Sequence, residues 1–146
     1  MSFLLFALGT FSQSVYPYRE IRLDKPADFK TAEPFALSAA NFLLSNPFKK
    51  DDHDRKEAFE FLITWTAGDK DYNFNLQGVI LELADDKDIM QLFLAAMTKF
   101  CLENKTLGTN TKLIENYAVK TVLDYSNNLS NNFTLKKKQR KRLESN

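Results

Sequence analysis

The residues of this chain that could do chemistry begin with an acidic run that reads Asp-Lys-Asp-Tyr-Asn. Its alternate oxygen-bearing side chains, Asp69, Asp71 and Asn73, match the first three ligand positions of a calcium-binding loop. The match ends there, because the sixth position needs Gly and holds Phe74, and the twelfth needs a bidentate Glu and holds Ile80. The run is better interpreted as a polar turn between helices, and we expect no metal ion at Asp69, Asp71 and Asn73.

The only histidine, His53, lies among three carboxylates in the run Asp51-Asp52-His53-Asp54. Imidazole and carboxylate groups are common metal ligands. Consecutive residues of a helix, however, point in different directions and rarely converge on one ion. We therefore interpret the run as the capped start of a helix that carries a solvated histidine.

No catalytic arrangement is visible in the sequence. One His and one Cys, in unlike surroundings, offer no Ser-His-Asp or Cys-His set, and the chain has no GxGxxG, Walker, HExxH or CxxC motif. A pair of carboxylates brought together by the fold stays open as an enzyme hypothesis, since spacing alone cannot reveal such a pair. We predict a protein that is not an enzyme, with no catalytic residue and no cofactor.

The strongest charge feature is the C-terminal tail. Six of the 20 basic residues and one of the 19 acidic residues fall within residues 135–146, which leaves 14 basic and 18 acidic residues elsewhere. A mildly acidic body therefore carries a basic tail, and such runs are usually disordered. We predict a disordered tail that could bind an anionic surface or nucleic acid through Lys136, Lys137, Lys138, Arg140, Lys141 and Arg142. No aromatic residue is interleaved with these charges, so base stacking is not indicated.

Helical periodicity dominates residues 31–134, which we assign to a single domain. Four helices are expected: the first from about Thr31 to Asn46, the second from a capping box at Asp54 and Glu57 to Gly68, the third from the acidic residues Asp85, Asp86 and Asp88 to shortly before Gly108, and the fourth from Thr111 to Tyr125. The second helix is expected to bury a broad apolar face that consists of Ala58, Phe59, Leu62, Ile63 and Trp65. Residues 71–83 could form a strand or a short helix, and we favour a helix from about Gly78 to Ala84. The predicted fold is an all-α bundle of four to five helices in two αα-hairpins, with an irregular arm at residues 15–30 and the basic tail at residues 135–146.

The opening segment predicts the compartment. Residues 1–14 carry no charge, Phe3 to Phe11 is an apolar run, and Ser12 and Ser14 place small residues at alternate positions. This layout is typical of a secretory signal peptide cleaved after Ser14, although the usual basic residue before the apolar run is missing. The run is too short for a membrane span, which needs about 20 residues. We predict a secreted or periplasmic protein, or a cytoplasmic one if residues 1–14 belong to the core.

The single cysteine, Cys101, excludes an internal disulfide. Phe93, Leu94, Met97 and Phe100 precede it at helical spacing, which indicates a thiol buried as a small apolar group.

Three segments carry a resemblance to known proteins. They are Ser-Val-Tyr-Pro-Tyr-Arg-Glu at residues 14–20, Phe-Ala-Leu-Ser-Ala-Ala at residues 35–40 and Phe-Cys-Leu-Glu-Asn-Lys at residues 100–105. Together they resemble small exported all-helical proteins of Bacteroidetes-type bacteria. The resemblance implies export and a helical fold, and it implies no activity and no functional residue.

These observations predict a non-enzymatic exported protein that acts through contact with a protein or with the cell envelope. The expected contacts are aromatic side chains that gather in an exposed patch, drawn from Tyr16, Tyr18, Trp65 and Tyr72. Binding of an anionic surface or of nucleic acid through the tail is the alternative, and export would argue against nucleic acid as the partner. A carboxylate-based enzyme is the third hypothesis.

Overall fold

The computed structural model describes residues 17–146, and the regular structure of this part of the chain is helical, with no strand. Its α-helices are α1 (Pro26–Thr31), α2 (Glu33–Ser45), α3 (His53–Gly68), α4 (Gly78–Leu83), α5 (Lys87–Glu103), α6 (Thr111–Asn127) and α7 (Lys137–Glu144). Short 3-10 turns lie at η1 (Tyr18–Glu20), η2 (Lys105–Leu107) and η3 (Leu129–Asn131). The all-α prediction is confirmed for these residues, whereas the predicted signal peptide, residues 1–14, lies outside them.

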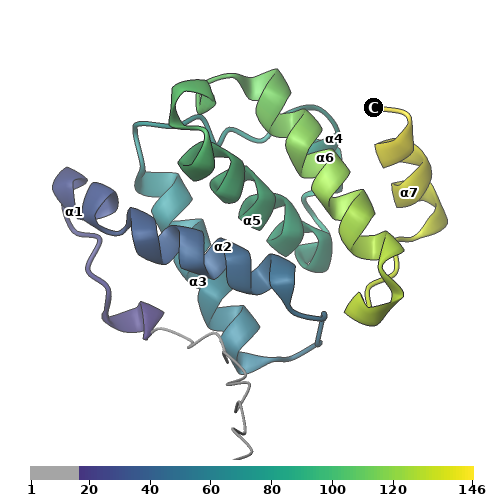
Figure 1. The fold of residues 1–146 in the computed structure, drawn as a ribbon, viewed down its shortest axis with the longest axis horizontal. Coiled ribbons are helices and arrows are strands. Elements are labelled where there is room, and N and C mark those ends of the chain that lie inside the picture. The colour runs from purple at the N-terminus through teal and green to yellow at the C-terminus, as the bar shows by residue number, and fades with distance from the viewer. Residues whose placement is uncertain (1–16) are drawn as a thin grey trace, which may run out of the picture.

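Helix α5 lies at the centre of the fold, with α2 and α3 on one side of it and α6 on the other (Figure 1). Every residue from Leu92 to Thr98 is buried. A helix with apolar residues on all sides must be covered on all sides. The sequence of α5 therefore requires neighbours around it, and the two predicted hairpins, α2–α3 and α5–α6, supply them.

The core consists of two apolar clusters that share α5 as a common wall. One cluster joins η1, α2 and α3 to the face of α5 that carries Leu94, Ala95 and Leu102. The other joins α4, α6 and α7 to the opposite face, which carries Phe93 and Met97. Burial of large side chains such as Phe93 contributes about 1.5–3 kcal/mol each to folding, so α5 couples the two halves of the molecule energetically.

Most helix starts agree with the sequence. The Asp86 side chain caps α5 by accepting hydrogen bonds from the backbone N–H groups of Asp88 (3.0 Å) and Ile89 (3.3 Å). The short helix favoured for residues 78–84 is present as α4. The predicted cap of α3 is wrong: Asp52, not Asp54, accepts a hydrogen bond from the backbone N–H of Arg55 (2.9 Å).

The N-terminal arm is more regular than the sequence predicts. Helix α1 was not expected, yet Pro26 begins it with a suitable φ, and the Asp28 carboxylate accepts a hydrogen bond from the backbone N–H of Lys25 (3.1 Å). The Tyr18 ring stacks on Phe61 of α3 with ring centres 5.1 Å apart. The arm therefore packs on α3 as part of the core.

Gly68 ends α3 as predicted, but the reason for a glycine is close packing. A Cβ atom at Gly68 would lie 2.2 Å from two ring atoms of Phe29. The Trp65 indole N–H also donates a hydrogen bond to the backbone carbonyl of Phe29 (2.9 Å). The missing side chain therefore allows the arm to approach the end of α3.

The prediction of a disordered tail is wrong, because residues Lys137–Glu144 form α7. Leu135 and Leu143 are buried in the second cluster, at 5% and 1% exposure. The Arg142 guanidinium donates two hydrogen bonds of 2.7 Å to the Glu82 carboxylate of α4. A prediction of disorder from composition considers the charged run alone. In the folded protein, Glu82 and Asp86 contact residues of the tail, and Leu135 and Leu143 add apolar contacts.

The helices of residues 17–146 do not have the properties of a membrane span. No helix there is both long enough and apolar enough to cross a bilayer.

Candidate functional site

An open groove runs between α3 and α5. It consists of two hollows of about 620 and 500 Å³, which adjoin because Ile63 and Met90 line both. Ile63 is 46% exposed, although the sequence places it on the buried face of its helix. Large apolar side chains that also line the groove are Phe48, Phe59, Phe74, Leu76 and Leu94. Grooves of this size can hold ligands of drug-like size, so the polar groups along its length decide whether it can do chemistry.

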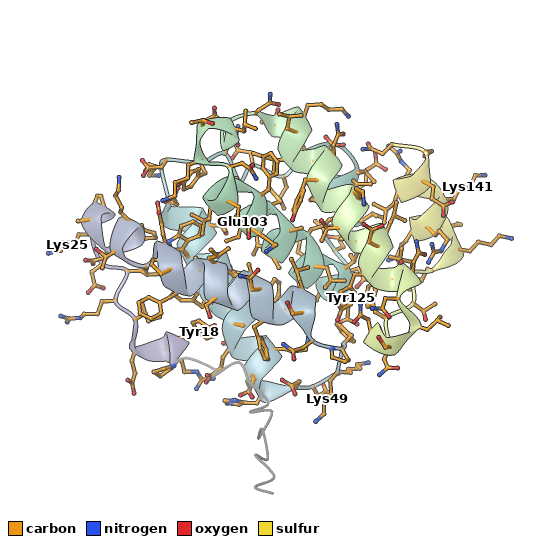
Figure 2. The ribbon with its side chains drawn as sticks, in the orientation of Figure 1. Tyr18, Lys25, Lys49, Glu103, Tyr125 and Lys141 are labelled. Atoms are coloured by element: carbon orange, nitrogen blue, oxygen red, sulfur yellow. The ribbon has the colours of Figure 1, made fainter. Side chains whose placement is uncertain are left out.

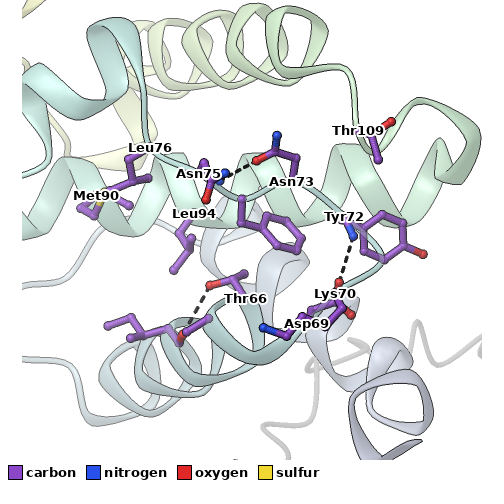
Figure 3. Close-up of a pocket in the computed structure, with 13 residues that line it drawn as sticks. Thr66, Asp69, Lys70, Tyr72, Asn73, Asn75, Leu76, Met90, Leu94 and Thr109 are labelled. Atoms are coloured by element: carbon purple, nitrogen blue, oxygen red, sulfur yellow. Dashed lines mark hydrogen bonds between the residues drawn. The ribbon is translucent and has the colours of Figure 1, made fainter. Parts of the chain in front are cut away.

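The calcium-like run lies at one end of this groove, with Tyr72 and Asp69 at the opposite end of the hollow from Met90 (Figure 3). Asp69 Oδ1 accepts hydrogen bonds from the backbone N–H groups of Asp71 (2.9 Å) and Tyr72 (3.1 Å). Asn73 Oδ1 accepts one from the backbone N–H of Asn75 (3.0 Å). These oxygens shape a turn. Among the described residues, no group of three or more His, Cys, Asp or Glu side chains is placed to hold a metal ion.

Burial governs the electrostatics of this end. It raises the pKa of the Asp69 carboxyl, against the opposing effect of the two backbone N–H groups. Burial and the neighbouring Glu33 carboxylate likewise raise the pKa of the Tyr72 phenol, whose hydroxyl donates a hydrogen bond to Glu33 Oε1 (3.2 Å). Lys105 Nζ lies 2.7 Å from Glu33 Oε2. This network ties α2, the residue-72 loop and η2 together, and it leaves Glu33 paired.

At the other end of the groove lies a buried cation, Arg55, which is 3% exposed. Its guanidinium donates hydrogen bonds to the backbone carbonyls of Leu43 (3.1 Å) and Asn46 (3.4 Å). These carbonyls belong to the C-terminal end of α2, where the helix dipole favours a positive charge. The guanidinium also lies over the Phe48 ring, 5.1 Å from its centre. Arg55 therefore caps α2, and its burial lowers its pKa.

Acidic residues also line this end of the groove, namely Asp51, Asp52, Glu60 and Asp88. Asp52 caps α3, and Glu60 Oε1 lies 3.8 Å from Lys56 Nζ. His53 is exposed, within 3.6 Å of Asp54 and 3.5 Å of Glu57. The groove thus gathers several acids, as the enzyme hypothesis requires, but two of them have structural partners.

Cys101 is buried in α5, as predicted. Burial raises the pKa of its thiol to about 12, and the charge of Asp69 adds to this effect. The Sγ–H group lies 3.8 Å from the backbone carbonyl of Gly108, which it can donate to. A thiol with this pKa is protonated at neutral pH and is a poor nucleophile.

The aromatic patch expected from the sequence is not exposed. Trp65 is fully buried and Tyr18 is 3% exposed. Tyr72 is half-buried and packs against Trp65 with ring centres 6.4 Å apart. Tyr16 lies outside the described residues. These rings build the core, because aromatic side chains bury more area than any other type.

The six basic residues of the tail divide into two sets. Arg142 pairs with Glu82, Arg140 donates hydrogen bonds to Asn127 Oδ1 (2.8 Å) and Ser126 Oγ (3.2 Å), and Lys136 Nζ lies 3.8 Å from Asp86 Oδ2. The other three form what we call the lysine face, which consists of Lys137, Lys138 and Lys141.

The lysine face is exposed, and its ammonium groups make no hydrogen bond or ion pair with any residue in the range 17–146. Lys141 follows Lys137 by four residues and Lys138 by three, so the three side chains share one side of α7. Figure 2 shows Lys141 at the outer edge of the molecule. The sequence named all six residues together, and only the docked helix separates the free charges from the paired ones.

Scans of the chain against protein-family models, curated proteins and solved structures found no match. The two candidate surfaces, the groove and the lysine face, are therefore interpreted from their own geometry.

Proposed function

We propose that this protein is a non-enzymatic exported protein that attaches to anionic phospholipid surfaces through the lysine face of α7. The observation that carries the proposal is the division of the tail charges. Three lysines project from one side of a folded helix without acidic partners among residues 17–146, while the nearby carboxylates of Glu82 and Asp86 contact other residues of the tail.

The physical basis is electrostatic attraction to lipid headgroups. Each basic side chain near an anionic membrane surface contributes on the order of 1 kcal/mol of attraction. Three lysines on a helix that is already folded keep most of this attraction, because binding does not have to order a flexible tail. The acidic body, in contrast, is repelled, so the protein should bind with α7 towards the lipid.

Lipid is favoured over nucleic acid for two reasons. The tail has no aromatic side chain for base stacking. The uncharged apolar segment at residues 1–14 supports export, which would remove the protein from cytoplasmic nucleic acid. Export is tested by sequencing the N-terminus of the mature protein, where Val15 is the expected first residue and an intact Met1 would contradict export.

The binding test uses vesicles of phosphatidylcholine with and without phosphatidylglycerol. We expect co-sedimentation only with the anionic vesicles, and a steep loss of binding as salt screens the charges. The triple variant Lys137→Gln, Lys138→Gln, Lys141→Gln should weaken binding about 100-fold.

A matched control removes three other exposed lysines, by changing Lys25, Lys30 and Lys70 to Gln. Lys25 lies at the opposite edge of the molecule from Lys141 (Figure 2). This control has the same net charge as the first variant, so only the location of the charges differs. Equal losses in the two variants, or binding of DNA without binding of anionic vesicles, would overturn the proposal.

A further inference from the structure

The most exposed large apolar side chain of the described residues belongs to Leu129. It is 90% exposed, whereas the other exposed large apolar side chains range from 39% to 58%. Leu129 begins η3, the turn between α6 and α7, and its sequence neighbours are Asn127, Asn128, Ser130 and Asn131. A leucine that projects this far from a polar turn makes little contribution to the core.

The turn that carries Leu129 is firmly held. Asn128 Oδ1 accepts hydrogen bonds from the backbone N–H of Ser130 (3.1 Å) and from its hydroxyl (2.6 Å). The Asn131 side chain donates to the backbone carbonyl of Tyr125 (3.0 Å), and the Asn131 carbonyl accepts from the backbone N–H of Phe48 (2.7 Å). The exposure of Leu129 is therefore a property of an ordered turn.

This turn lies close to α7, the helix that carries the lysine face. Arg140, which follows Lys137 by one helical turn and precedes Lys141, reaches the last residues of α6 through Ser126 and Asn127. Leu129 follows Asn127 by two residues. In Figure 1 the end of α6, η3 and α7 lie on one side of the molecule, and η3 also contacts the segment after α2 through Phe48.

We infer that Leu129 inserts into the boundary between lipid headgroups and acyl chains when the lysine face binds a membrane. The inference rests on the proposed function and adds a second contact to it. Peripheral membrane binding commonly combines an apolar insertion with attraction between basic residues and anionic lipids. The lysines would supply salt-sensitive attraction, and Leu129 would supply a contact that salt does not screen.

The test places a reporter at the turn. In the variant Leu129→Trp, the new indole should be quenched by lipids brominated on their acyl chains when the protein binds anionic vesicles. The native Trp65 is fully buried and provides a constant background. The matched control is Leu107→Trp, because Leu107 is 40% exposed and precedes α6, whereas Leu129 follows it. A helix of 17 residues is about 25 Å long, so this control should remain unquenched.

A second variant, Leu129→Ala, should weaken binding to anionic vesicles about tenfold and leave its salt dependence unchanged. The same change at the 39% exposed Leu113 of α6 should have little effect. If the protein binds vesicles through its lysines but the indole introduced by Leu129→Trp is not quenched, the inference fails and the proposed function stands. If no vesicle binding occurs, both fail.

Discussion

Helices α5 and α7 form opposite extremes of the same fold. Helix α5 is enclosed by α2, α3 and α6, and its apolar residues would require this position in any fold. Helix α7 belongs to the basic tail, and it is held by Leu143, by Leu135 just before it, and by contacts to Glu82 and Asp86. The comparison shows that the position of a helix can be determined by its own apolar residues, as in α5. It can also be determined by contacts with the rest of the fold, as in α7.

The largest loss of stability is expected when a buried side chain of α5 is truncated. Phe93→Ala removes a fully buried ring and should lower the free energy of unfolding by about 3–5 kcal/mol. Urea denaturation followed by circular dichroism measures this loss, and we expect a single cooperative transition because α5 belongs to both clusters. A cost below about 1 kcal/mol would show that α5 is not the common wall of the core.

A smaller and more local effect is expected for Leu143→Ala. The lost contact should weaken α7 docking by about 2 kcal/mol, and α7 should open while the rest of the molecule stays folded. Hydrogen exchange should become faster at amides of residues 137–144 and remain unchanged in α5. Lys141→Ala, at an exposed position of the same helix, serves as the control. Equal acceleration in α5 and α7 would contradict the idea of a separately held helix.

The thiol of α5 predicts a pH dependence. Burial raises the pKa of Cys101 from 9.0 to about 12, so above pH 9 the unfolded chain releases a proton that the folded protein retains. The contribution of this thiol to the free energy of unfolding is therefore fully present below pH 9. It decreases as the pH rises above 9, with a limiting slope of about 1.4 kcal/mol per pH unit. Urea midpoints at pH 8, 9 and 10 measure this loss, and Cys101→Ala should flatten the curve.

The same burial should block reaction of Cys101 with a thiol reagent in the folded protein. Labelling at pH 8 should be slow in buffer and fast in urea. Rapid labelling in buffer would mean that the Cys101 thiol is accessible to solvent. Helix α5 would then not be enclosed, in contradiction to its comparison with α7.

The smallest effect is expected at the surface of α7. Glu82→Gln removes the carboxylate that accepts two hydrogen bonds from Arg142, and exposed pairs of this kind contribute little to stability. The change should slightly accelerate tryptic cleavage after Lys141 at low salt, and the effect should fade at high salt.

The same pair also has a pH signature. The hydrogen bond from Arg142 lowers the pKa of Glu82, so the stabilisation is present at neutral pH and is lost as the pH falls through that pKa. The native protein and the Glu82→Gln variant should therefore converge in acid, and a difference that persists there would assign the effect to another cause.

Much of the fold could be read from the sequence because its signals are local. The acidic start of α5, the helix beginning at Gly78 and the burial of Cys101 all follow from residues a few positions away. Ile63 and Trp65 show the limit of such reasoning. Both lie on the predicted apolar face of α3, yet Trp65 is fully buried and Ile63 is 46% exposed beside the groove. Which part of that face is covered depends on where α5 crosses it.

The candidate site was predicted only in outline. The sequence named six basic residues of the tail. Separating Lys137, Lys138 and Lys141 from the other three would have required the prediction that the tail forms a helix. Leu129 was missed altogether, and its only signal is a single leucine within an Asn- and Ser-rich turn. Its exposure depends on the hydrogen bonds that hold η3.

By itself, the sequence determined that residues 31–134 are mostly helical, that α5 lies in the core and that basic charge is concentrated in the tail. Apolar spacing and capping residues act within a few turns, so they can be read without knowledge of the fold. Only the tertiary structure decided that the tail is a helix and which lysines remain free. Those outcomes depend on Glu82 and Asp86, which lie more than 50 positions earlier in the sequence, as the separations of 60 and 53 between bonded residues show.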